Sequence, residues 1–204
     1  FVYDSKKSGA MTVSHLRFGP DSIRAPYLIS SANFLGIHQF QFLRNASCLD
    51  FAADGATLLL NAPHGPDSIW DQVSDEVVSK VRTKGLKVYV IDAYKVAREI
   101  GLGPRTNTIM QTCFFAISGV LEKDAAIARI KTAIEKTYAR KGREVVEKNF
   151  EAVDASVANL FEAPLPESSA GRAGLPLPAY RSPEAPEFVR DVSARILDGE
   201  GDLL

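Results

Sequence analysis

Two short apolar runs in the first half of the chain predict strands that are buried on both faces of a sheet. They cover residues 56–60 and 87–91, and both are bounded by glycine, asparagine or aspartate. Runs of this length between turn-forming residues are typical of parallel strands covered by helices. An earlier segment, residues 11–18, alternates apolar and polar positions imperfectly, which predicts a further strand near the start of the chain.

A helix is predicted between the two apolar runs, over residues 67–84. Its apolar positions recur every four residues and form one stripe: Ile69, Val73, Val77 and Val81. Asp67 or Ser68 can cap its start, and Gly85 suits the left-handed position after its end. Strand, helix and strand joined by short connections predict a right-handed parallel crossover. We therefore expect an α/β fold, a three-layer α/β/α sandwich with a largely parallel sheet.

The second half of the chain is predicted to be mostly helical. Four stretches have the apolar spacing of helices: residues 93–100, 108–120, 122–139 and 142–160. Beyond them, residues 163–186 are rich in proline, serine, glycine and alanine, and a short amphipathic piece follows at 187–197. We expect one globular domain over residues 1–162 and an extended linker toward a further domain over 163–204. A disordered C-terminal tail is the alternative interpretation.

Composition narrows the classes of function. Twenty-four basic and 25 acidic side chains give a net charge of −1, so we expect no general attraction to nucleic acid or to an anionic membrane. Cys48 and Cys113 lie far apart without a CxxC neighbour. They are too few for an iron–sulfur cluster or a zinc site, and they fit a reducing, cytoplasmic setting. No apolar run approaches the roughly 20 residues that a transmembrane helix needs.

The loop over residues 101–108 is the richest candidate for ligand binding. It ends one predicted helix and begins the next, and it brings glycines together with Arg105, Thr106 and Asn107. A helix N-terminus beside a cation suits an anion or a polar ligand. Simple capping of the helix by Thr106 or Asn107 explains the same residues equally well.

Two further segments are candidates with simpler alternatives. In the turn over residues 6–9, Lys6 and Lys7 can meet a phosphate, although basic turns of this kind are usually solvated. His64 follows a predicted parallel strand, at the edge where open α/β sheets bind ligands. A small hydrolase using His64 with Asp92 or another acid is therefore one hypothesis, but the sequence pairs no serine or cysteine nucleophile with this histidine.

Three other polar residues are placed where a cleft could form. Asn149 lies close to the apolar stripe of a predicted helix, and His15 and Arg17 belong to the predicted early strand. A structural hydrogen bond or an interface explains each of them as well as a ligand does.

Five segments resemble the gamma-type domain of the pyruvate:ferredoxin/flavodoxin oxidoreductases. They are FVYDSKKSG at 1–9, TVSHLRFG at 12–19, DGATLLLN at 54–61, YVIDA at 89–93 and NTIMQTCFF at 107–115. The resemblance runs from Phe1 to about residue 160, and it is strongest to the single-chain bacterial form associated with nitrogen fixation. The C-terminal tail resembles the strap that leads to the ferredoxin-like domain.

The resemblance implies part of an enzyme that decarboxylates pyruvate on thiamine diphosphate and Mg²⁺. Such enzymes pass electrons through 4Fe–4S clusters to ferredoxin or flavodoxin, transfer the acetyl group to coenzyme A, and often form homodimers. The domain itself carries no catalytic residue, so the isolated chain is expected to be inactive. Its contacts with coenzyme A are expected at Lys6, Asn107 and Asn149. Lysine is a natural phosphate partner, and each asparagine offers a donor and an acceptor.

One departure from the family concerns the start of the chain. Phe1, Val2 and Tyr3 have the character of a strand entered midway. The family places a glycine-rich strand-to-helix unit before this segment, and that unit also contacts the cofactor. We therefore expect a preceding segment; a free-standing gamma subunit of a related 2-oxoacid:ferredoxin oxidoreductase is the alternative.

Overall fold

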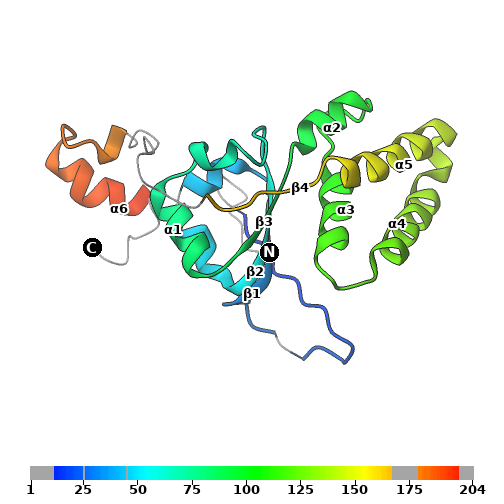
Figure 1. Ribbon diagram of the computed structural model, residues 1–204, viewed down its shortest axis with the longest axis horizontal. Coiled ribbons are helices and arrows are strands. Elements are labelled where there is room, and N and C mark those ends of the chain that lie inside the picture. Colours follow the sequence, from blue (N-terminus) through cyan, green and yellow to red (C-terminus); the bar gives the residue numbers. More distant parts are fainter. Residues whose placement is uncertain (1–11, 25, 45, 167–178, 198–204) are drawn as a thin grey trace.

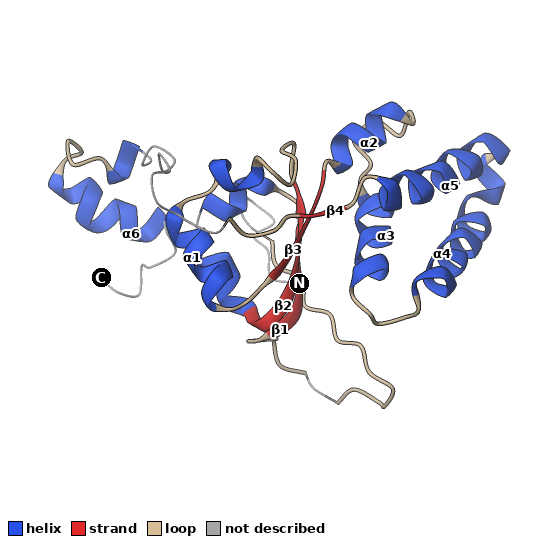
Figure 2. Ribbon diagram, viewed as in Figure 1, coloured by secondary structure: helices blue, strands red, loops and turns tan. Residues whose placement is uncertain are grey.

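The computed structural model describes residues 12–24, 26–44, 46–166 and 179–197. Its centre is a four-stranded sheet in the order β1-β2-β3-β4. The strands are β1 (Ala32–Ile37), β2 (Ala52–Asn61), β3 (Lys87–Ile91) and β4 (Phe161–Glu162). The first three are parallel, and the short β4 runs antiparallel to β3 (Figure 2). The predicted α/β class with a largely parallel sheet is confirmed.

Both apolar runs form the strands that were predicted. The first lies within β2, and the second coincides with β3. The two strands pair in register, with Leu58 opposite Val88 and Leu60 opposite Val90. All four of these side chains are buried, as expected for a strand pair covered on both faces.

The strand predicted over residues 11–18 is wrong in its described part. Only Val13 makes an isolated bridge, and the rest of this stretch has no regular strand. Two of the apolar positions in this alternating pattern, Leu16 and Phe18, are exposed. The pattern therefore does not mark a sheet with one buried face. The edge position beside β2 is taken instead by β1, a segment in which a glycine and an asparagine interrupt the apolar pattern.

Helices cover both faces of the sheet, which gives the three predicted layers (Figure 1). One face carries α1 (Asp75–Thr83), and the other carries α2 (Ala93–Glu99), α3 (Asn107–Ile117) and α5 (Arg143–Ala158). The helix α4 (Lys123–Tyr138) packs against α3 and α5. The shorter elements are η1 (Phe40–Arg44), η2 (Ala46–Phe51), η3 (Ile69–Gln72), η4 (Ala139–Lys141), η5 (Ala179–Arg181), η6 (Val189–Ser193) and α6 (Ala194–Leu197).

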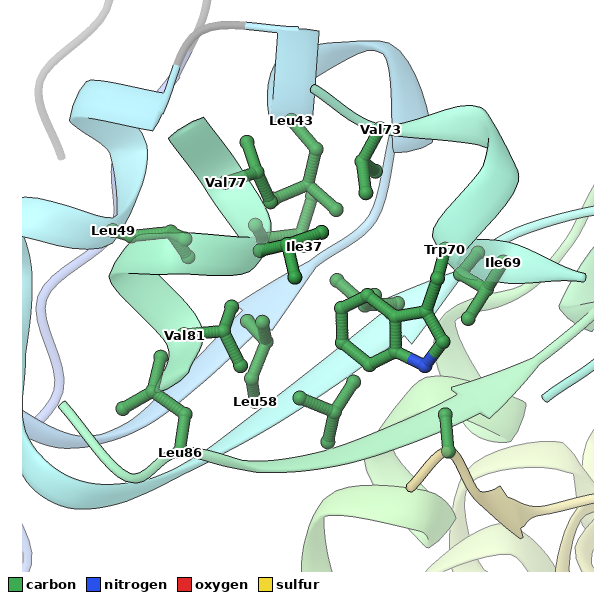
Figure 3. Packing of buried hydrophobic residues seen from close by; sticks show 14 of the residues in the cluster. Ile37, Leu43, Leu49, Leu58, Ile69, Trp70, Val73, Val77, Val81 and Leu86 are labelled. Carbon is green, nitrogen blue, oxygen red and sulfur yellow. The ribbon is translucent and has the colours of Figure 1, made fainter. Parts of the chain in front are cut away.

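Two apolar cores lie on opposite sides of the sheet. Successive strand residues point to opposite faces, and neighbouring leucines of β2 show this directly. Leu58 belongs to the core under α1, where it packs with Trp70 and Val81 (Figure 3). Leu59 belongs to the core under α2, α3 and α5, with Ile109 among its members. A third, smaller cluster lies between α4 and α5.

The single helix predicted over residues 67–84 is divided in two. A 3-10 turn, η3, comes first, and Val73 then adopts an extended conformation with φ −126° and ψ 157°. The α-helix begins only at Asp75. The four residues of the predicted stripe are nevertheless all buried in one core. Both parts of the divided segment therefore still direct their apolar side chains into this core.

The start of α1 shows why the predicted cap was wrong. Ser74 is the N-cap, and its hydroxyl accepts a hydrogen bond from the Val77 N–H at 3.4 Å. Asp75 and Glu76 follow in the first turn, where acidic side chains interact favourably with the helix dipole. This start is better than one at Ser68, which makes no side-chain capping bond. The end is as predicted, since Gly85 has φ +61°.

The start of the predicted linker lies against the globular core. Ala163 is buried, and its N–H donates to the Val88 carbonyl at 2.8 Å. The indole Nε1 of Trp70 donates to the Pro164 carbonyl at 2.8 Å, and Arg82 donates to the Pro166 carbonyl at 2.7 Å. A domain boundary near residue 162 stays a prediction. In the described part of the chain, no helix is both long and apolar enough to cross a bilayer.

Candidate functional site

Two of the three residues expected to contact coenzyme A lie at one place in the fold. Asn107 is the first residue of α3, and Asn149 lies in the middle of α5. The two helices pack against each other. Lys6, the third residue, lies outside the described residues, so its position relative to the two asparagines stays a prediction.

Asn149 ties the beginning of α3 to α5. Its side-chain oxygen Oδ1 accepts from the Thr108 hydroxyl at 3.3 Å, and its Nδ2 donates to the Val145 carbonyl at 2.8 Å. The residue is only 6% exposed. Asn107, which is adjacent to Thr108 in the chain, is exposed. Asn149 is therefore placed to hold the helix start in position, while Asn107 faces solvent.

The beginning of α3 lacks the side-chain cap that the sequence suggested as an alternative. Thr106 occupies the N-cap position, but it makes no side-chain capping hydrogen bond. Asn107 lies inside the helix and does not cap it. The first hydrogen bond of the helix joins the Met110 N–H to the Thr106 carbonyl at 2.9 Å. The N–H groups of the three preceding residues, 107–109, therefore have no carbonyl partner within the helix. Their partial positive charge favours an anion or a carbonyl oxygen.

Cationic side chains flank the same loop. Arg105 is exposed one position before the N-cap. The Lys148 ammonium lies 4.0 Å from the point where a Cβ on Gly101 would stand. Lys148 also donates to Glu144 Oε1 at 2.7 Å, and this hydrogen bond, with the accompanying charge, lowers the pKa of the Glu144 carboxyl. The loop thus combines helix N–H groups, an amide side chain and two cations.

The contacts of His64 and Asp92 do not favour a hydrolase. The His64 ring lies edge-on to Phe40, with centroids 5.4 Å apart. Asp92 is the N-cap of α2, and its Oδ1 accepts from the Lys95 N–H at 2.8 Å. Each side chain therefore has a local structural role, and the described interactions do not place the two residues in a base-and-acid pair.

Sequence reasoning missed a structural role for Asn61 at the carboxyl edge of the sheet. Asn61 is buried at the end of β2. Its Nδ2 donates to the His38 carbonyl at 3.0 Å, and its Oδ1 accepts from the Ala93 N–H at 3.0 Å. The residue fixes the chain after β1 and the beginning of α2 to the same point. A polar residue that ends an apolar strand was the available signal. Burial also lowers the pKa of His38 at this edge.

His15 and Arg17 make structural contacts within the segment before β1, and His15 also contacts η2. The His15 Nδ1 accepts from the Ile29 N–H at 3.0 Å, and its ring lies edge-on to Phe51. The Arg17 guanidinium lies 4.9 Å from the centre of the Tyr27 ring. Of the interpretations considered for these residues, the structural hydrogen bond describes His15.

The chemistry of the two cysteines does not suit a metal centre. Burial raises the pKa of Cys48 to about 11 and the pKa of Cys113 to about 12, whereas metal ligation requires the thiolate. Across residues 12–24, 26–44, 46–166 and 179–197, no group of three or more His, Cys, Asp or Glu side chains could hold a metal ion.

Thiol labelling provides a test of the Cys113 environment. Cys113 is fully buried, and its folded-state pKa of about 12 lies above the ordinary value of 9.0. We expect iodoacetamide to label Cys113 in the native chain more slowly than half-buried Cys48, with both labelled readily in guanidinium. Since the folded state holds this proton more tightly, the thiol's contribution to stability is present below pH 9.0 and is lost as the pH rises toward about 12. Mass spectrometry measures the labelling rate of each cysteine. If Cys113 were labelled faster than Cys48 in the native chain, its buried placement would be contradicted.

A double-mutant cycle tests the link between α3 and α5. Asn149→Ala is expected to lower the free energy of unfolding by about 1–3 kcal/mol, since it removes a partner from buried polar groups. Thr108→Val removes only the hydroxyl, and we expect a coupling energy with Asn149→Ala of about 0.5–1.5 kcal/mol in urea denaturation. Thr132→Val is the matched control, because its hydroxyl donates to Ala128 within α4. Equal coupling of both threonines with Asn149 would refute a specific hydrogen bond.

Comparison with known proteins connects this geometry to a family. The family model described as "Pyruvate ferredoxin/flavodoxin oxidoreductase" matches residues 1–158. The chain is 54% identical over 204 residues to the pyruvate-flavodoxin oxidoreductase of Rhodospirillum rubrum, and 50% identical over 204 residues to a putative pyruvate-flavodoxin oxidoreductase of Synechocystis. Each match covers 100% of this chain and 17% of the relative, so the chain spans about a sixth of these relatives' length.

A solved structure supports the fold. The pyruvate oxidoreductase subunit PORC from Thermotoga maritima superimposes with a TM-score of 0.51 at 16% identity, covering 67% of each chain. At this identity the likeness concerns the α/β fold alone. The family membership follows from the sequence match over residues 1–158: the chain belongs to the pyruvate ferredoxin/flavodoxin oxidoreductase family.

Proposed function

We propose that this chain is part of an enzyme that oxidatively decarboxylates pyruvate to acetyl-coenzyme A and reduces flavodoxin or ferredoxin. The match of the whole chain to long pyruvate-flavodoxin oxidoreductases is the observation that carries this proposal. In the overall reaction, pyruvate loses carbon dioxide and two electrons, and the acetyl group forms a thioester with coenzyme A. Thiamine diphosphate with Mg²⁺ supplies the decarboxylation chemistry and 4Fe–4S clusters conduct the electrons, in other parts of the polypeptide.

The role proposed for this chain is to help hold coenzyme A. The exposed Asn107 amide and the uncapped N–H groups at the start of α3 can donate to the cofactor's phosphate or carbonyl oxygens. Lys6 supplies a mobile positive charge for a phosphate. Asn149 supports this site through its hydrogen bond to Thr108. The chain's own residues bind and orient the cofactor, and the reacting atoms lie elsewhere.

The proposal extends to the assembly of the whole protein. Its other domains belong to the same polypeptide, since each relative matches all of this chain over only 17% of its own length. Flavodoxin or ferredoxin accepts the electrons, the active protein is a homodimer, and the cytoplasm is its compartment. Neither nucleic acid nor a membrane is a partner in this proposal.

Steady-state kinetics of the full-length enzyme test the coenzyme A site. Asn107→Ala is expected to raise the KM for coenzyme A by about 2–10-fold, which corresponds to one neutral hydrogen bond. The KM for pyruvate should change little, because the contact proposed for Asn107 is with coenzyme A. Asn33→Ala is the matched control, since Asn33 is an exposed asparagine on β1. An unchanged coenzyme A dependence in the Asn107 variant would count directly against the site.

A further inference from the structure

Exposed apolar side chains gather on one projecting part of the molecule. We define the exposed arm as residues 12–24 and 26–31, the stretch that precedes β1. Among the described residues, five of the eleven exposed large apolar side chains lie in this arm: Leu16, Phe18, Ile23, Tyr27 and Leu28. Figure 1 shows the arm, in dark blue, extending from the sheet beyond the helical layers. Apolar side chains gathered in this way on a surface mark an interaction site.

The exposed arm is held in a defined shape. Its two limbs are joined by the hydrogen bond from the Ile29 N–H to His15 Nδ1 and by the contact of Arg17 with the Tyr27 ring. Phe18 stacks on Phe114 of α3, with ring centroids 5.7 Å apart. These contacts fix the backbone of the arm while Leu16 and Tyr27 remain 69% and 71% exposed. A surface that is ordered before docking loses little entropy on binding.

The composition of the arm has several features of an interface. It carries aromatic residues and two arginines, it has neither lysine nor glutamate, and its remaining polar residues include Asp21 and four serines. Aromatic residues and arginine are enriched in protein interfaces, whereas lysine and glutamate are depleted there. The stacking of Phe18 also connects the arm to half-buried rings of the fold, because Phe114 contacts Phe34 and Phe115 edge-on.

We propose that the exposed arm docks onto another domain of the same polypeptide. This inference rests on the proposed function, in which the chain is one part of a long oxidoreductase. The relatives match this chain over 17% of their own length, so most of the polypeptide lies outside it. A covalently attached domain is present at a high effective concentration, and a contact between domains of one chain needs only a modest apolar surface. The occupant is therefore an apolar face of a neighbouring domain.

Site-specific photocrosslinking in the full-length polypeptide tests this docking. The photoreactive amino acid p-benzoylphenylalanine would replace Phe18 or Tyr27 in the arm, and Thr137, an exposed residue of α4, as the control. We expect crosslinks from both arm positions to peptides outside residues 1–204, without a change in the mass of the polypeptide. Their yield should exceed that at Thr137 by about tenfold, because the attached partner is held close.

A second variant checks that the apolar contact is responsible. Leu16→Glu places a charge on the docking surface and is expected to reduce the crosslink yield at Tyr27 by about fivefold, since an unpaired charge is costly at an apolar interface. Thr137→Glu should leave the yield unchanged. Arm yields no higher than at Thr137, or crosslinks that double the mass by joining two copies, would overturn the proposal.

The same preparations separate this inference from the proposed function. Their pyruvate oxidation is measured with and without coenzyme A. An active enzyme without arm crosslinks overturns the docking and leaves the function standing. Intramolecular arm crosslinks in a protein that does not oxidise pyruvate support the docking and overturn the function.

Discussion

Replacing Leu58 with alanine is expected to lower the free energy of unfolding of the chain by about 2–5 kcal/mol, the range for truncating a buried leucine. Leu58 lies at the centre of β2 and is 1% exposed. It pairs with Val88 on β3 and packs under α1 with Trp70 and Val81 (Figure 3). Removal of its branched end leaves a cavity between sheet and helix, because close-packed neighbours relax only partly.

Urea denaturation followed by tryptophan fluorescence measures this loss. Trp70 is the only tryptophan of the chain, and it is 4% exposed within the same core. Leu197→Ala is the matched control, since Leu197 is exposed on α6, and we expect a change within about 0.5 kcal/mol. A loss at Leu58 as small as that at Leu197 would show that the core under α1 is not packed as described.

The central strands and the helices of the second half could be predicted because their signals are local. An apolar run such as the one from Leu58 to Leu60 fixes a buried strand without knowledge of its partner. The end of α1 was equally accessible, since Gly85 has the positive φ that its position requires. In these places the local preference and the tertiary environment agree, so the pattern alone was sufficient.

The sheet edge could not be predicted, because it depends on which segment finds a partner. The alternation around Leu16 and Phe18 resembles a half-buried strand, yet both side chains are exposed. Only one position was available beside β2, and β1 occupies it with a register shift near its start. An alternating pattern indicates that the two faces of a segment differ in polarity. It does not indicate whether the apolar face is covered by this chain or by another domain.

The candidate site was predictable in its residues more than in its geometry. The position of Asn107 at a helix start follows from the turn residues before it. The burial of Asn149 and its hydrogen bond to Thr108 depend on the packing of two helices that bring together residues 41 positions apart in the chain, which no local pattern contains. Asn61 was missed for the same reason, since its partners come from two other strand ends.

In the full-length enzyme, Lys6→Ala is expected to raise the KM for coenzyme A by about 10–100-fold, because a hydrogen bond to a charged group contributes about 1.5–3 kcal/mol. The KM for pyruvate should be nearly unchanged, since the contact proposed for Lys6 involves a phosphate of the second substrate. At saturating coenzyme A, kcat should also be retained, because a uniform binding contact affects the KM alone. Initial rates at varied coenzyme A and fixed pyruvate measure both quantities.

Lys7→Ala is the matched control for this prediction, because it removes the same charge one position away. A general attraction between a basic turn and the cofactor's phosphates would make the two variants equivalent. A specific contact instead makes Lys6 sensitive and Lys7 nearly silent, and Lys6→Arg should then recover only part of the affinity, since arginine and lysine differ in shape and donor geometry. If both lysine variants raised the KM equally, the phosphate contact would have to be assigned to the turn as a whole and not to Lys6.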